Sequence, residues 1–231
     1  MANPTTNYGW QMPTPTDLVT DLPADFEVFG QAVDTSLLGL KGGTTGQVLS
    51  KTSGTDMAFT WIPAATGGLT LISTNAFSAV STKQVTGCFS ATYNNYLVLF
   101  EVTAGTADAS LKLRFSVSGV DNTTTNYFFA SNGIRPTGAA APLTTNGAGT
   151  LDIGRINNNS TQTQKYHLDI FKPFTAAATG ISAIGYAQDV TAGIAINGGG
   201  NFNAANSFDG ITFYPTGGAM TGTITVYGYQ S

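Results

Sequence analysis

The chain has 231 residues, of which only 10% are charged and 11% are aromatic. This length accommodates one sizeable domain and a smaller appendage, and Val, Ile, Leu, Phe and Tyr recur at strand spacing, which excludes a disordered polar chain. Residues 1–67 carry two bases and six acids, which accounts for the whole net charge of −4, whereas residues 68–231 are neutral. A neutral domain offers no excess of basic side chains to neutralise phosphates, so we do not expect this protein to bind nucleic acid.

The sequence also shows no pattern typical of a signal peptide or a transmembrane segment, and it has one cysteine. The N-terminus MANPTTNYGW has no basic region followed by an apolar run, and the longest apolar run, Tyr96 to Phe100, is far below membrane-spanning length. The single cysteine, Cys88, rules out an intrachain disulfide and is expected to be a small, buried strand residue. We expect a soluble protein that is made in the cytoplasm, is not inserted into a membrane and reaches any outer surface by assembly.

Residues 1–17 are predicted to form an extended docking peptide. Prolines at positions 4, 13 and 15 disfavour a helix, and the only large aromatic side chains are Tyr8 and Trp10. Aromatic side chains on an extended segment need a partner surface, so we expect Tyr8, Trp10, Pro13 and Pro15 to dock to another protein. The alternative is a strap folded back over the chain's own domain.

Residues 18–41 are predicted to form a short helical stalk. Asp21 and Pro23 mark its start, and Gly42 marks its end. An apolar stripe recurs at spacings of three and four, with one lapse at Ser36. The stripe residues, which we expect to form a trimer seam, are Val19, Leu22, Phe26, Phe29, Val33, Leu37 (beside the lapse) and Leu40. The alternative is a helix packed on the β-domain of the same chain.

Residues 42–67 are predicted to be a glycine-rich linker with a short β-ribbon. Gln47–Leu49 and Phe59–Ile62 are strand candidates on either side of the turn at 53–56, and Gly67–Gly68 closes the segment. A two-stranded ribbon is marginal alone.

The segment KGGTTGQVLSKTSGTDMAFTWI, residues 41–62, resembles the linker of tailed-bacteriophage fibre and minor virion structural proteins. The upstream NYGWQMPTPTDLVTDLPADFEVFGQAVD is similar to the N-termini of such proteins, as SFDGITFYPTGG and GTITVYGYQ are to their heads. The resemblance implies a virion location, N-terminal docking to another virion protein, and a ribbon completed by neighbouring chains. Together with the apolar stripe it predicts a homotrimer.

Residues 68–231 are predicted to form a mainly β head, an antiparallel β-sandwich that is jelly-roll-like. Alternation is clean in several segments; for example, His167, Asp169 and Phe171 oppose Tyr166, Leu168 and Ile170. The predicted strands are 69–73, 77–84, 96–103, 111–118, 127–131, 151–156, 165–171, 181–187, 192–196, 210–214 and 222–229. Polar loops are expected at 119–126, 132–149, 157–163 and 197–207, the last because INGGGNFNAAN has no regular pattern.

No catalytic, metal or cofactor chemistry is expected in this chain. His167 is the only histidine, so a zinc site lacks ligands, and it is interpreted as a structural strand residue. Gly198–Gly200 has no Lys-Ser/Thr after it and is not a phosphate loop. The seven acids of the head are scattered singly, whereas glycan cleavage needs two positioned carboxylates. We therefore expect a non-enzyme.

A surface of Ser, Thr and Asn with aromatic side chains on loops suits recognition of sugars or proteins. The sequence thus predicts that the head binds a host-surface receptor, a glycan or a protein, with contacts from Tyr127, Arg135, Asn159 and Phe202. The alternative is a capsid-attached head fibre or decoration protein with a structural role. A glycan hydrolase acting through carboxylates paired across the fold or across a trimer seam is the third hypothesis.

Overall fold

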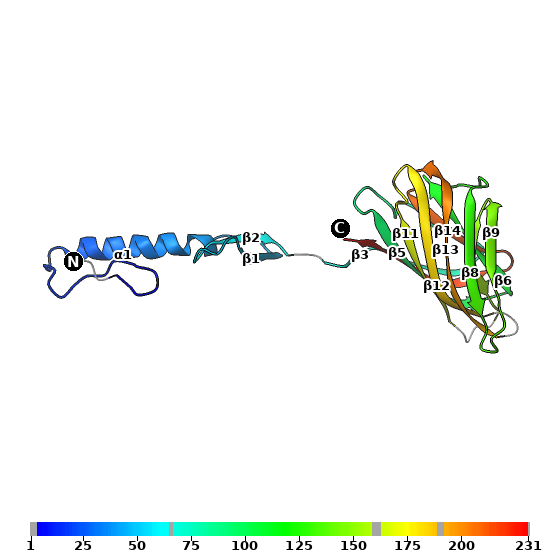
Figure 1. The fold of residues 1–231 in the computed structure, drawn as a ribbon, viewed down its shortest axis with the longest axis horizontal. Coiled ribbons are helices and arrows are strands. Elements are labelled where there is room, and N and C mark those ends of the chain that lie inside the picture. Colours follow the sequence, from blue (N-terminus) through cyan, green and yellow to red (C-terminus); the bar gives the residue numbers. More distant parts are fainter. Residues whose placement is uncertain (1–3, 65–66, 159–162, 189–191, 231) are drawn as a thin grey trace. The chain divides into compact units, whose positions relative to one another are not determined.

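The computed structural model describes residues 4–64, 67–158, 163–188 and 192–230 (Figure 1). The chain forms two compact units, Met1–Ala65 and Thr66–Ser231.

The helix of the first unit is α1 (Leu22–Leu37), which continues into a 3₁₀ turn, η1 (Leu38–Leu40). It begins after Asp21 with Pro23 in its first turn, as predicted, and no residue of α1 is buried. Two members of the apolar stripe lie outside the α-helix, because Val19 precedes it and Leu40 belongs to the 3₁₀ turn. The regular apolar spacing therefore covers only the central part of the predicted stalk.

The ribbon of the first unit consists of β1 (Gln47–Lys51) and β2 (Phe59–Pro63), paired antiparallel with Leu49 opposite Trp61. This confirms the predicted ribbon, with slightly longer strands. Gly43, at φ +88°, lies against the ribbon; a Cβ atom there would come 2.6 Å from Trp61 Cδ2. Glycine is thus needed at position 43 both for the backbone angle and for the close approach of the indole ring.

The second unit contains an eight-stranded and a five-stranded antiparallel sheet (Figure 1). The larger sheet has the order β3 (Leu69–Val80), β15 (Met220–Tyr229), β5 (Asn95–Gly105), β11 (Gln164–Phe171), β12 (Ala177–Gln188), β13 (Gly193–Asn206), β8 (Tyr127–Ile134) and β9 (Leu143–Ala148). The smaller sheet has the order β10 (Leu151–Ile156), β6 (Ala109–Val117), β14 (Gly210–Pro215) and β4 (Lys83–Val85), with β7 (Val120–Asp121) paired to β6.

The core lies between the two sheets because alternate residues of each strand are buried. In β5, the buried residues Tyr96, Val98 and Phe100 alternate with half-exposed ones. Phe100 of the larger sheet stacks on Phe213 of the smaller sheet, with ring centroids 4.5 Å apart. The expected mainly β, sandwich-like head with antiparallel sheets is confirmed.

Two buried tyrosines, Tyr96 and Tyr127, fix backbone segments through their hydroxyl groups. The Tyr96 hydroxyl accepts from the Ser90 N–H and donates to the Ser90 carbonyl. Tyr127 accepts from the Phe115 N–H and donates to the Asn122 carbonyl. A buried phenol needs such partners, since an unsatisfied hydroxyl inside a core costs about 1–3 kcal/mol.

The predicted loop at 197–207 is wrong, because residues up to Asn206 belong to strand β13. Its glycines are sites of close backbone approach. A Cβ atom at Gly198 would lie 2.5 Å from Ser131 Cβ, and one at Gly200 would lie 2.7 Å from Phe129 Cα. Strand β8 therefore runs so close to β13 that Gly198 and Gly200 have no room for a side chain. In the sequence, a strand with glycines at such positions has the same pattern as a loop.

Other predicted boundaries are also corrected. Residues 132–149 are not one loop, since β8 extends to Ile134 and β9 follows within the same stretch. Residues 69–80 form the single strand β3 rather than parts of two. Cys88 is buried, as expected, but lies between strands β4 and β5 instead of in one. Part of the predicted loop at 157–163 lies outside the described residues.

Candidate functional site

Two of the four predicted receptor contacts are core residues. Tyr127 and Phe202 are both fully buried, and their rings pack edge to face with centroids 4.9 Å apart. Both strands place these residues on the inner side of the sheet, and the partner sheet then covers the rings. The prediction that they present stacking faces to a ligand is wrong.

The other two predicted contacts do not form a site either. Arg135 follows β8, is half-exposed, and its guanidinium donates to the Ala140 carbonyl at 3.5 Å in the connection to β9. Asn159 lies outside the described residues. Because Tyr127 and Phe202 meet inside the core, a binding surface built from the four predicted contacts has no support in the described part of the chain.

The N-terminal aromatic pair contacts the helix of its own unit. Tyr8 stacks on Trp10 at 5.0 Å, and Trp10 meets Phe29 edge to face at 6.0 Å. The Trp10 Nε1–H donates to Ser36 Oγ at 3.0 Å, and this hydroxyl donates to the Ala32 carbonyl. Ser36, the lapse in the apolar stripe, is thus the acceptor for the indole. The alternative of a strap folded back on its own chain fits this geometry, and docking by Tyr8 and Trp10 stays a prediction.

The outward side of the five-stranded sheet is occupied by paired charges. Asp152 pairs with Lys112 at 2.9 Å and with Arg155 at 3.2 Å. The Arg114 guanidinium lies 4.8 Å from the centroid of the Tyr214 ring and 3.9 Å from Asp121. Because these groups satisfy one another, the face is a structural network with little left to bind a ligand.

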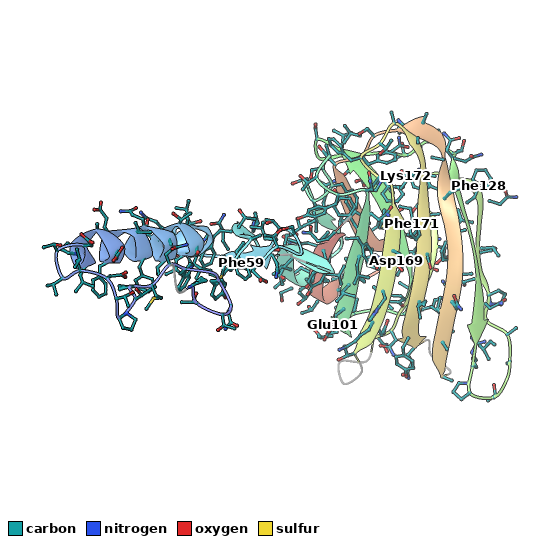
Figure 2. All side chains as sticks on the ribbon, turned by 60° about the vertical axis from the view of Figure 1, so that its left-hand side comes forward. Phe59, Glu101, Phe128, Asp169, Phe171 and Lys172 are labelled. Atoms are coloured by element: carbon teal, nitrogen blue, oxygen red, sulfur yellow. The ribbon has the colours of Figure 1, made fainter. Side chains whose placement is uncertain are left out.

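The outward side of the eight-stranded sheet is different, because its side chains are less covered. Its registers form rows that cross β5, β11 and β12. One row contains Leu99, His167 and Ile184; the next contains Leu97, Asp169 and Ser182; the third contains Asn95, Phe171 and Gly180. Aliphatic, polar, aromatic and very small residues therefore lie side by side on an accessible surface. Figure 2 shows Asp169 and Phe171 along β11, with Phe128 farther across the sheet.

A cavity of about 290 Å³ opens on this side, lined by Asn95, Asp169, Phe171 and Tyr229. Three adjacent strands supply these residues: β5, β11 and β15. Phe171 is 42% exposed and leans over Gly180, where an added Cβ atom would lie 3.2 Å from the ring atom Cδ2. The glycine thus provides the space that the phenyl ring occupies.

The polar groups of the cavity are partly satisfied. The Tyr229 hydroxyl donates to Asp169 Oδ1 at 2.5 Å, and this hydrogen bond raises the pKa of Tyr229 to about 12. No group in the described part of the chain donates to Asp169 Oδ2, and the Asn95 side-chain amide likewise has no partner there. Both remain available to solvent or to a ligand.

A second, shallower hollow of about 560 Å³ lies across the sheet, lined by residues of β8, β9 and β13 that include Phe128, Ala130 and Gly199. In the row of Phe171 and Gly180, the next residues are Asn201 and Phe128. Phe171 and Phe128 are three strand spacings apart, roughly 14 Å. The strip between them has a floor of small residues.

The sequence did contain a signal for this surface. The alternation of His167, Asp169 and Phe171 places them on one side of a strand whose other side is buried. Their neighbours on β5 and β15 could not be known, because strand order is not readable from the pattern.

The described residues do not meet the requirements for a metal site or for a membrane-spanning helix. No group of three or more His, Cys, Asp or Glu there could hold a metal ion, and none of their helices is long and apolar enough to cross a membrane. Comparison with known protein families finds no match, and no curated protein matches the chain.

Proposed function

We propose that this chain is a homotrimeric virion fibre protein of a tailed bacteriophage. Its N-terminal residues attach to another virion protein, three copies of α1 form a coiled-coil stalk, and the jelly-roll-like head binds a host-surface receptor. The resemblance of residues 41–62 to phage fibre linkers supports the class of protein. The observation that carries the assembly is the exposed apolar stripe of α1.

The helix needs a partner for energetic reasons. Phe26 is 60% exposed and Leu37 is 43% exposed, and α1 has only 16 residues, none of them buried. A helix of this length is marginal alone in water, and most of its stability must come from packing. Trp10 covers part of the stripe near Phe29. The remaining apolar residues are available for contacts between copies.

The test of the assembly is the mass of the full chain in solution. We expect a particle of three 23.9 kDa chains. Phe26→Asp places a charge in the seam, which costs several kcal/mol when unpaired, and should shift the mass to that of one chain. Val28→Asp, at a position that is 53% exposed but off the stripe, is the matched control and should stay trimeric. A wild-type monomer or dimer over a wide concentration range would contradict the proposal.

The test of location is antibody labelling of phage particles that carry the chain, viewed by electron microscopy. Labelling at the tail, together with binding of the purified trimer to host cells, is the expected result. Labelling on the capsid without host-cell binding would replace the receptor role by that of a head fibre or decoration protein. Removal of residues 1–17 should abolish incorporation; truncated protein that still copurifies with particles would mean that docking lies elsewhere.

A further inference from the structure

We propose that the cavity lined by Asn95, Asp169, Phe171 and Tyr229 binds one neutral hexopyranose unit of a surface glycan. The inference rests on the proposed receptor-binding function and names its ligand class and its site. The site lies on the outward side of the eight-stranded sheet, away from the loops that the sequence analysis indicated.

The aromatic wall suits one side of a sugar ring. A pyranose presents several C–H groups on one face, and these pack favourably against the electron-rich face of a phenyl ring. The Phe171 ring can offer such a face, because it lies over Gly180 and the residue is still 42% exposed. Tyr229 supplies a second ring from the neighbouring side of the cavity.

The polar wall suits sugar hydroxyls. A carboxylate accepts hydrogen bonds only, and charge-assisted bonds are about twice as strong as neutral ones. Asp169 uses Oδ1 for the Tyr229 hydroxyl, which leaves Oδ2 for a ligand. The Asn95 amide both donates and accepts, so it can bind the next hydroxyl of the same ring. Adjacent equatorial hydroxyls need this combination of acceptor and donor.

Charge and size select among glycans. Asp169 is the one acidic or basic residue among the described residues that line the cavity, so a uronic or sialic acid would place two carboxyl groups together, which is unfavourable. Lys172 follows Phe171 in the chain but does not line the cavity. The volume of about 290 Å³ is at the lower end of ligand pockets and corresponds to a single sugar ring. Display of several copies on a fibre compensates for weak binding per site.

The test uses saturation-transfer NMR with the full-length protein and the methyl glycosides of glucose, galactose, mannose and N-acetylglucosamine. At least one of these should bind. Asp169→Asn and Phe171→Ala should each weaken binding by roughly ten-fold or more, because the first removes the charged acceptor and the second removes the aromatic wall. His167→Ala, exposed on the same strand but outside the cavity, is the control and should leave binding unchanged.

Three results would overturn the inference: no glycoside binds the wild-type protein, N-acetylneuraminic acid binds better than every neutral sugar, or both cavity variants bind as the wild type does. A change of oligomer mass on Phe171→Ala would also overturn it, because the face would then be a contact between subunits. A trimeric, particle-attached chain that binds no glycoside rejects this site alone. A monomer that binds a glycoside through these residues rejects the fibre proposal and supports the site.

Discussion

Tyr166 is the residue whose hydroxyl group is most tightly tied to an irregularity of the fold. It accepts from the Arg155 N–H at 2.9 Å and donates to the Arg155 carbonyl, where β10 has a register shift against β6. Gly154 makes room for it, since a Cβ atom there would lie 2.5 Å from Tyr166 Cζ. One phenol thus gives partners to two backbone groups of β10, a strand with a neighbour on one side only in this sheet.

Replacing Tyr166 by Phe should therefore be costly although the ring is kept. Two backbone groups of Arg155 would lose their partner in a poorly hydrated place, and we expect a loss of about 1–3 kcal/mol in the free energy of unfolding. Urea denaturation followed by circular dichroism measures it. Tyr186→Phe is the matched control, because Tyr186 is exposed and, among the described residues, its hydroxyl makes one long hydrogen bond of 3.4 Å, to Gln188. Equal effects of the two changes would contradict this role of the hydroxyl.

Single residues were also where sequence reasoning was least reliable. Tyr127 and Phe202 are predicted to bind a receptor because they lie beside or within expected polar loops and their rings offer stacking faces, yet both lie in the core. Exposure depends on which side of a strand faces the other sheet, and that could be read only where alternation is long, as for Asp169 and Phe171. The cavity needs Asn95 and Tyr229 from distant parts of the chain, which no local pattern reveals.

Among the elements, β13 departs most from its sequence signal, and its glycines give a direct test. Gly200→Ala should destabilise the second unit by about 1–3 kcal/mol or more, because the new methyl group would overlap the Phe128 carbonyl and approach Phe129 Cα. Gly199→Ala should be tolerated, since its added Cβ would lie 3.4 Å from the Ile181 carbonyl oxygen.

Thermal unfolding of both glycine variants provides the measurement. The matched pair changes the same residue type by the same methyl group at adjacent positions, so any effect of glycine entropy is shared. If both variants melt together with the wild type, β8 and β13 are not as closely packed as described. If Gly199→Ala is the more damaging change, the outward direction of position 199 is wrong.

The helix shows how much an element's pattern predicts. Its type, its start near Pro23 and its apolar spacing were readable from capping and periodicity. The role of Ser36, the lapse in the apolar stripe, could not be predicted in this way, because its hydroxyl accepts a hydrogen bond from Trp10, 26 residues away. Periodicity describes one element at a time and carries no information on such a contact.

At the scale of the second unit, buried ionisable groups predict a loss of stability at alkaline pH. Burial raises the pKa of Cys88 from 9.0 to about 12 and also raises the pKa values of Tyr127 and Tyr166 above their ordinary value of 10.0. A group whose pKa is higher in the folded than in the unfolded protein contributes its full stabilisation of the folded state below the unfolded-state pKa. It loses that contribution as the pH rises toward the folded-state pKa. Stability should thus be flat between pH 7 and about 8.5 and fall above about pH 9–10.

The measurement is the free energy of unfolding in urea between pH 7 and 11.5. Each buried group adds a slope of up to about 1.4 kcal/mol per pH unit once its unfolded form ionises. Cys88→Ala should remove the part of the decline that begins near pH 9, because Cys88 has the lowest unfolded pKa of the three groups. Stability that stays constant up to pH 11.5 would mean that these groups are hydrated in the folded protein.

The class of the fold was predictable because short alternating strands without helical periodicity leave few architectures. The order of strands was not, since β3 pairs with β15 across almost the whole unit. Such non-local pairings depend on the complete set of sheet contacts and leave no trace in a local stretch of sequence.

The pairing of β3 with β15 has a consequence for how such a protein changes over time. Leu69 lies opposite Tyr229, and the Gln230 N–H donates to the Gly68 carbonyl at 2.9 Å. The polypeptide therefore enters and leaves the second unit at one place, beside Gly67–Gly68. A unit with adjoining ends can be inserted into a chain or exchanged for another unit with little disturbance of what lies outside it. The geometry therefore permits replacement of the head while the sequence before residue 67 is kept.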